Sequence, residues 1–252
     1  MPRQVWITDE IVARGKAKYS SNWSGPLITD LKIFDEQFVI ATTNDWTEGE
    51  ANGTTIAAGA VDGGSMVMTA SGTTDDCGEL SHTAQWSAAS NCGMLVKAKI
   101  SAITADNVCF GFVDAAEATN DHVAGELVTT PTLRDPTVTG DFCGMVFDTD
   151  ADTAVWYMAA IANNVIGTPV AATGTLAPVA NTFFYGAVQT DTVGNVLFYY
   201  GTKLNELKPV GVLKSAISYA STNLLTPYVG FIARDTVAKV CTVSRIITWQ
   251  DN

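Results

Sequence analysis

Apolar and polar residues alternate with a period of two over long stretches of the chain, most clearly between residues 92 and 115. Residues 94–100 place Met, Val, Ala and Ile on one side and Leu and two lysines on the other, as in a β-strand with one buried and one wetter face. Asp106 and Asn107 then favour a turn, and residues 108–112 alternate again through a second strand. We expect this pair of strands to form the centre of the fold.

The same pattern recurs along the chain as short strands joined by short turns. Asp, Asn and Gly gather between the strands, and no long helical period interrupts them. About a dozen strands of this kind predict an all-β protein, an antiparallel β-sandwich. Beyond the strand at 79–87, the expected pairs are 54–60 with 65–70, 142–147 with 153–160 and 182–190 with 196–200, and the strands 224–234 and 238–249 complete the sheets.

Length and composition favour one domain preceded by an extended arm. The chain has 252 residues, of which 47% are hydrophobic, enough for a core without disulfides. No change in composition divides residues 27–252, which we expect to form the sandwich. Residues 1–26 lack strand alternation and form the expected N-terminal arm. Residues 116–140 predict a long loop, a common place for function or assembly contacts.

Basic residues are scarce, and the formal net charge is −12. Between Lys99 and Lys203 the single basic residue is Arg134, so the middle of the chain would repel a phosphate backbone, and we expect no direct contact with nucleic acid. The arm combines basic and apolar residues that suit docking on an acidic neighbouring subunit, and the alternative is a solvated tail. Its candidate contact residues are Val5, Trp6, Ile7, Arg14, Lys16, Lys18 and Trp23.

The five cysteines cannot all pair within one chain, and they form no C-x-x-C element of a zinc or redox motif. Cys109 and Cys241 fall in apolar strands and are expected in the core. Cys77 and Cys92 flank a predicted strand, where a disulfide across a hairpin is the alternative to two free thiols. This usage suits a reducing cytoplasm. The sequence shows no signal-peptide core and no apolar run that would span a bilayer.

Acidic residues and histidines offer few candidates for a metal-binding or catalytic site. Asp148, Asp150 and Asp152 form D-x-D-x-D, which suits calcium, but the glycine and glutamate of an EF-hand loop are missing and a solvated turn is favoured. His82 and His122 are the only histidines. His82 is expected to pack on its strand face, and neither comes with a G-x-S-x-G element. No predicted strand carries the paired carboxylates of a glycosidase, so we expect no enzymatic activity and no cofactor.

Aromatic side chains are the candidates for a saccharide contact, because an apolar ring stacks on a sugar while polar neighbours bind its hydroxyls. Consecutive aromatic residues on a strand point to opposite faces, so about one of each pair is expected in the core. The candidate contacts are Trp46, Trp156 and Tyr157.

Several strand and turn segments, taken together, resemble the pattern of a known protein family. They are Asp75-Asp76 leading to 80–86, MLVKAKI at 94–100, GFVDA at 111–115, the strands around Trp156, GNVLFYYG at 194–201, and LTPY at 225–228. Over roughly residues 28–250 the chain resembles bacteriophage structural proteins with a concanavalin A-like lectin/glucanase jelly roll. It lacks the glucanase E-x-D-x-x-E and a legume-lectin metal cluster, so the resemblance implies the fold without those sites.

The resemblance implies a non-enzymatic virion protein, first of all a decoration or cement protein on the exterior of a phage capsid, assembled in the host cytoplasm. Its partners would be the major capsid protein and copies of itself, and trimers would match the local symmetry of a head. Many weak contacts would add up through multivalency. The alternative is a tail- or fibre-associated adhesin that binds host-surface glycans through an aromatic-lined sheet face.

Overall fold

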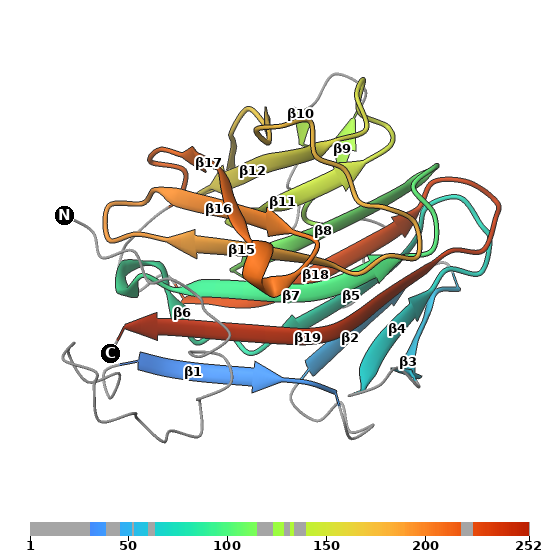
Figure 1. Cartoon of the computed structure of the whole chain (residues 1–252), viewed down its shortest axis with the longest axis horizontal. Helices are drawn as coiled ribbons and strands as arrows, with labels where there is room; N and C mark the ends of the chain where they lie inside the picture. Colours follow the sequence, from blue (N-terminus) through green and yellow to red (C-terminus); the bar gives the residue numbers. More distant parts are fainter. Residues whose placement is uncertain are drawn as a thin grey trace.

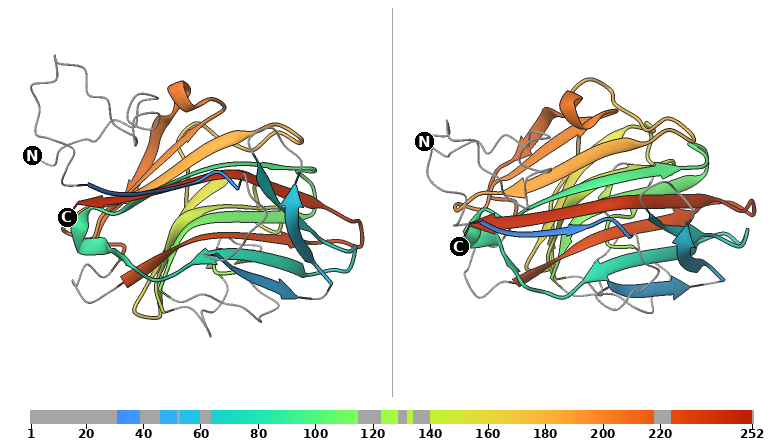
Figure 2. Two further views of the ribbon diagram at one scale, coloured as in Figure 1. Left: turned by 90° about the horizontal axis from the view of Figure 1, so that it is seen from below. Right: turned by 60° about the horizontal axis from the view of Figure 1, so that its bottom comes forward.

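The computed structural model describes residues 31–38, 46–51, 53–59, 64–114, 123–128, 132–133, 140–217 and 224–251. In this part of the chain, antiparallel strands form two large sheets that pack face to face (Figures 1 and 2). The prediction of an all-β antiparallel sandwich is confirmed. Residues 1–26, with every candidate contact of the predicted arm, lie outside the described residues, as does His122.

The eight-stranded sheet has the order β17-β16-β15-β7-β19-β4-β3, and β1 also pairs with β19. The long β19 serves both β1 and β4, because β1 pairs with its residues 246–251 and β4 with its residues 240–243. The strands are β1 Leu31–Glu36, β3 Thr55–Gly59, β4 Ser65–Thr69, β7 Gly93–Ile100, β15 Phe184–Thr190, β16 Val196–Gly201, β17 Lys208–Leu213 and β19 Val240–Asp251.

The nine-stranded sheet has the order β13-β12-β11-β8-β18-β5-β2, with β14 paired to β12 and β6 paired to β18. Its strands are β2 Trp46–Ala51, β5 Asp76–His82, β6 Trp86–Ser87, β8 Asp106–Val113, β11 Phe142–Asp148, β12 Trp156–Ala162, β13 Val165–Ile166, β14 Val170–Ala171 and β18 Leu224–Ala233. A separate small hairpin joins β9 Leu127–Val128 and β10 Thr132–Leu133.

Helical structure in the described residues is confined to two 3₁₀ turns, η2 Ala88–Ser90 and η3 Leu204–Glu206. Within the same residues, no helix is both long and apolar enough to cross a membrane.

The two strands expected at the centre of the fold exist, but they belong to different sheets. β7 pairs with β15 and β19, whereas β8 pairs with β11 and β18. The connection between them lies at residues 101–105, and Asp106 already begins β8, so the turn predicted at Asp106 and Asn107 is wrong. The chain crosses here from one sheet to the other, and the two strands face each other through the core instead of sharing hydrogen bonds.

The core between the sheets is built from the inward positions of both. Val96 and Ala98 of β7 pack in the same cluster as Phe110 and Phe112 of β8. Trp156 is fully buried at the centre of an aromatic group, with its ring centroid 5.4 Å from Phe110. The rings of Phe184 and Tyr200 lie 5.2 and 5.7 Å from it.

All five cysteines are free and buried, so the alternative of a Cys77–Cys92 disulfide is wrong. Cys92 packs in the core between the sheets, whereas Cys77 packs in a second cluster on the outer face of the nine-stranded sheet. Cys109 and Cys241 are fully buried, as expected for small core residues. Burial raises the pKa of the Cys92 thiol to about 12, which disfavours the reactive thiolate.

We expect the native protein not to react with Ellman's reagent at neutral pH. Unfolding in guanidinium without reductant should release all five thiols. A count of three thiols after unfolding would show that two cysteines are joined. Rapid reaction of the folded protein would contradict the burial described above.

Candidate functional site

A row of polar side chains crosses the outer face of the eight-stranded sheet, the face turned away from the core. Arg245 of β19 lies opposite Lys97 of β7, and Lys97 lies opposite Tyr185 of β15. Residues opposite each other on adjacent strands point to the same side of a sheet. Val96 and Ala98, the chain neighbours of Lys97, point into the core, so the row faces outward.

A β-bulge in β19 adds a second residue to this row. The pairing with β7 shifts between Val243 and Arg245, which leaves Ser244 as the extra residue. Val243 and Ile246 pack in the core, so Ser244 and Arg245 between them are both turned toward the outer face. Bulges are common beside functional sites because they redirect a side chain in this way.

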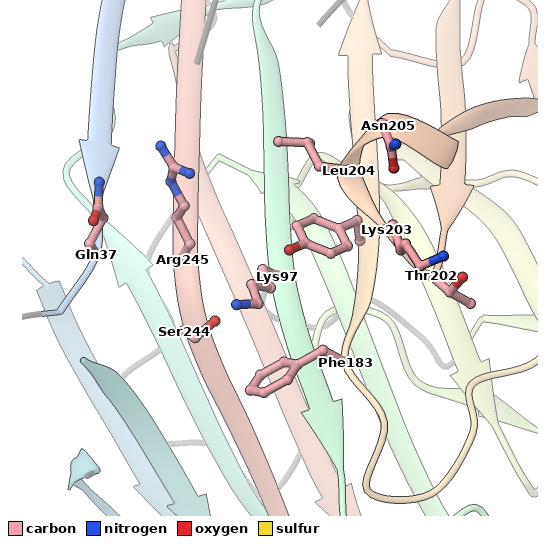
Figure 3. Close-up of a pocket in the computed structure, with 10 residues that line it drawn as sticks. Gln37, Lys97, Phe183, Thr202, Lys203, Leu204, Asn205, Ser244 and Arg245 are labelled. Atoms are coloured by element: carbon pink, nitrogen blue, oxygen red, sulfur yellow. The ribbon is translucent and has the colours of Figure 1, made fainter. Parts of the chain in front are cut away.

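These side chains line a groove of about 580 Å³ above β7 and β19, with η3 on its far side (Figure 3). Ligand-binding pockets commonly have volumes of roughly 300–1,000 Å³, so the groove has the size of a small-ligand site. Its lining is rich in basic, aromatic, amide and hydroxyl groups and consists of Gln37, Lys97, Phe183, Tyr185, Thr202, Lys203, Leu204, Asn205, Ser244 and Arg245.

Lysines 97 and 99 supply positive charge that no acidic residue among the described ones neutralises by an ion pair. The ammonium of Lys97 lies 4.7 Å from the centroid of the Phe183 ring and 6.0 Å from that of Tyr185. The ammonium of Lys99 lies 5.1 Å from the same Phe183 ring. Attraction to a ring face is weaker than an ion pair at such half-exposed positions, so both lysines remain available to an anion.

The two other basic residues of the groove already have acidic partners. Arg245 makes a bidentate contact with Asp35 of β1, with distances of 2.9 Å from Nε to Oδ1 and 2.8 Å from Nη2 to Oδ2. Lys203 pairs with Glu206 at 2.9 Å. The unbalanced charge of the groove lining therefore lies at Lys97, and Lys99 adds a second positive charge at the same Phe183 ring.

The outer face of the nine-stranded sheet is built differently, because a second apolar cluster that includes Val123, Leu127 and Leu133 covers it. At its edge, Arg234 extends from the end of β18 into a group of carboxylates. Its Nη2 lies 2.6 Å from Asp148 Oδ2 and its Nη1 lies 2.7 Å from Glu126 Oε1.

This ion-pair network accounts for Asp148 and Asp150 without calcium, and it shows that the favoured interpretation as a solvated turn is wrong for Asp148, which is the buried end of β11. Asp148 is fully buried and also accepts hydrogen bonds from the Asn107 amide and the Leu127 backbone N–H, at 2.7 and 2.8 Å. Asp150 lies in the turn with its side chain about half exposed, 3.5 Å from Arg234 Nε. No set of His, Cys, Asp and Glu residues in the described ranges forms a metal-binding group.

The three aromatic residues predicted to contact glycans lie inside the protein, so this prediction is wrong. Trp46, Trp156 and Tyr157 are 7%, 0% and 5% exposed. The Trp46 ring packs against His82, with centroids 5.3 Å apart, and the Tyr157 hydroxyl donates to the Thr153 carbonyl. Their ring faces are covered by the protein itself and cannot stack on a sugar.

The residues that line the groove were not predicted from the sequence as a site. Lys97 was assigned to the wetter face of its strand, but its neighbours were unknown because they come from β15 and β19, far along the chain. Ser244 depends on a bulge that leaves no clear trace in the alternation. Phe183 and Tyr185 are separated by one residue at the start of a predicted strand, which is a weak signal for a shared face.

No protein-family model and no curated protein sequence matches the chain. Several solved structures share its fold at low identity. The Bacillus licheniformis β-glucanase matches with a TM-score of 0.57 and 14% identity over 87% of this chain and 98% of its own. Peanut lectin matches with a TM-score of 0.59 and 12% identity over 87% and 97%. A protein of unknown function from Shewanella oneidensis MR-1 matches with a TM-score of 0.57 and 10% identity over 92% and 91%.

The shared fold shows which class of proteins this sandwich is similar to. Its structural neighbours have the concanavalin A-like lectin/glucanase jelly roll, and they include both lectins and glycosidases. At these levels of identity the likeness concerns the fold alone, because one fold serves several activities.

Proposed function

We propose that the chain is a non-enzymatic structural protein of a bacteriophage particle, a decoration or cement protein on the outside of the head. The observation that carries the non-enzymatic part is the lining of the groove, in which none of the described residues is Asp or Glu. A glycosidase needs two carboxylates that reach the substrate. The virion assignment is supported by the resemblance of the strand segments quoted above.

The buried carboxylates also support a structural protein, because many of them are held by structural partners. Asp148 and Glu126 bind Arg234. Glu79 accepts a hydrogen bond from the hydroxyl of Tyr228. Asp76 accepts bonds from the backbone N–H and the hydroxyl of Ser71 at 2.8 and 2.6 Å, which ties the turn to β5. Carboxylates in such contacts stabilise the fold.

In this proposal the sandwich is a rigid body attached to the shell by residues 1–26, which carry the predicted contacts with the major capsid protein and neighbouring copies. Each contact is weak, and the many copies on one head give the whole layer its stability. Trimers suit the local threefold positions of a head.

Quantitative mass spectrometry of purified virions tests this assignment. We expect a copy number near one per major capsid protein, or near one per three of them. Detection in cell lysate together with complete absence from the particle would overturn the virion assignment.

The second candidate function is a tail- or fibre-associated adhesin that binds host-surface glycans. The observation that favours it is the groove, where half-buried aromatic rings lie beside amide and hydroxyl groups. Saccharide sites combine the same two kinds of group. A handful of copies per particle in the experiment above would replace the decoration proposal with this one.

A further inference from the structure

The groove is lined by a lysine and a serine, Lys97 and Ser244, whose polar groups have no ion-pair or hydrogen-bond partner among the described residues. The chain has 26 acidic and 14 basic residues, so a lysine can easily find an acidic partner. Lys97 and Lys99 nevertheless share the Phe183 ring, and no carboxylate of the described residues pairs with them. Two cations against one ring repel each other unless an anion lies between or beside them.

Ser244 provides an independent observation at the same place. It is 5% exposed, and its hydroxyl has no hydrogen-bond partner among the described residues. Burying a hydroxyl without a partner destabilises the folded state, and each such group calls for an explanation. Ser244 and Lys97 both line the groove, and in the view of Figure 3 the Lys97 side chain lies between those of Ser244 and Phe183.

We propose that this groove binds a saccharide that carries a carboxylate, such as a chain of uronic acid residues. The Lys97 ammonium and the Ser244 hydroxyl donate hydrogen bonds to the carboxylate. The sugar ring lies against Phe183 and Tyr185, and its hydroxyls reach the polar rim. The Ser244 hydroxyl is buried in the unliganded protein. Lys97 has a flexible four-carbon side chain, and when this side chain rotates toward the carboxylate of the ligand, it exposes the Ser244 hydroxyl. The proposal names the ligand class of the saccharide-binding alternative above and rests on it.

The geometry favours a saccharide over an acidic peptide or a phosphate. Peptides that bind sheets generally pair with an unpaired edge strand, whereas β7 has hydrogen-bonded neighbours on both sides, and β19 pairs with β7 along the groove and with β1 from residue 246 onward. A free phosphate would use the Lys97 ammonium but not the Phe183 and Tyr185 rings beside it, whereas a sugar ring can also cover that apolar surface. Arg245, the one arginine lining the groove, already uses its fork to bind Asp35.

Isothermal titration calorimetry of the full chain with trigalacturonic acid and with galactotriose tests the proposal. These trisaccharides differ mainly in their carboxylates. We expect the acidic sugar to bind at least about tenfold more tightly than the neutral one, which corresponds to one charge-assisted hydrogen bond. Binding should weaken as salt is added.

Variants locate the binding. Lys97→Met and Ser244→Ala are each expected to weaken binding of the acidic trisaccharide by about tenfold, because each removes one hydrogen bond to the carboxylate. Lys214→Met is the matched control, because it removes the same charge from an exposed residue outside the groove lining. It should bind like the unaltered protein. Circular dichroism should show that each variant is folded.

The possible outcomes separate this inference from the functions proposed above. Equal binding of both trisaccharides overturns the carboxylate site and leaves the saccharide-binding alternative standing. Failure of both to bind overturns this inference, while the virion copy number still decides the structural role. A hexaglutamate peptide that binds as tightly as the acidic sugar, and loses binding in Lys97→Met, would assign the groove to acidic peptides instead.

Discussion

Replacing Arg234 with methionine is expected to lower the free energy of unfolding by about 3–5 kcal/mol. The side chains of Arg234, Glu126 and Asp148 are 5%, 2% and 0% exposed, so water cannot replace the lost guanidinium. Methionine fills a similar volume and leaves two carboxylates buried near each other without a cation. Equilibrium unfolding in urea at neutral pH measures the change.

Two further variants show whether the effect comes from the buried charges. Arg245→Met removes an arginine whose pair with Asp35 is more exposed, with side chains 24% and 29% accessible, and is expected to cost less than about 1 kcal/mol. Arg234→Lys keeps the charge but loses the fork that reaches two carboxylates, so its stability should fall between those of the methionine variant and the original protein. A loss below about 1 kcal/mol for Arg234→Met would show that the network contributes little to folding.

The strands were predictable because alternation records burial on each face of a strand. The alternation predicted strands best in the eight-stranded sheet, where β7 alternates between core residues and half-exposed lysines. It was less informative in the nine-stranded sheet, because β8 and β11 are buried along their whole length. Residues 116–140 were expected to form a long loop. Instead, Val123, Leu127 and Leu133 cover the outer face of that sheet, and Tyr157 is buried with them.

The site could not be predicted, because it depends on pairings between distant segments. Arg234 meets Asp148 and Glu126 across 86 and 108 positions of sequence, and Arg245 meets Asp35 across 210. Alternation predicts that a side chain points outward but not which strand lies beside it. The D-x-D-x-D pattern was compatible with a solvated turn or with calcium, because the cation that it meets, Arg234, is remote in sequence.

The second large effect that we expect is a dependence of the free energy of unfolding on pH, and it comes from Asp106. Asp106 begins β8, is fully buried, and neither of its carboxylate oxygens has a hydrogen-bond partner in the described residues. Burial raises its pKa from 3.8 to about 7, while Lys239 acts in the opposite direction and Asp148 and Asp235 add to the rise. At neutral pH the folded protein therefore holds this carboxyl partly protonated.

The direction of the effect follows from proton binding. Between pH 4 and pH 7 the folded state binds more protons at Asp106 than the unfolded state, so the free energy of unfolding contributed by this group falls as the pH rises. The contribution is full below about pH 4, where both states are protonated, and is lost above about pH 7. With these pKa values it changes by about 2–3 kcal/mol between pH 8 and pH 5.

Asp106→Asn isolates this contribution from those of the other carboxylates. Asparagine has nearly the same shape and no titrating proton, so the variant should lack the gain that the original protein receives from Asp106 on acidification. The difference in unfolding free energy between variant and original protein should therefore favour the variant by about 2–3 kcal/mol more at pH 8 than at pH 5. Urea unfolding at the two pH values gives this difference, and NMR titration of the Asp106 carboxyl carbon gives the pKa directly. Parallel stability profiles, or a carboxyl that titrates near pH 4, would show that water or a counter-charge reaches Asp106 in the folded protein.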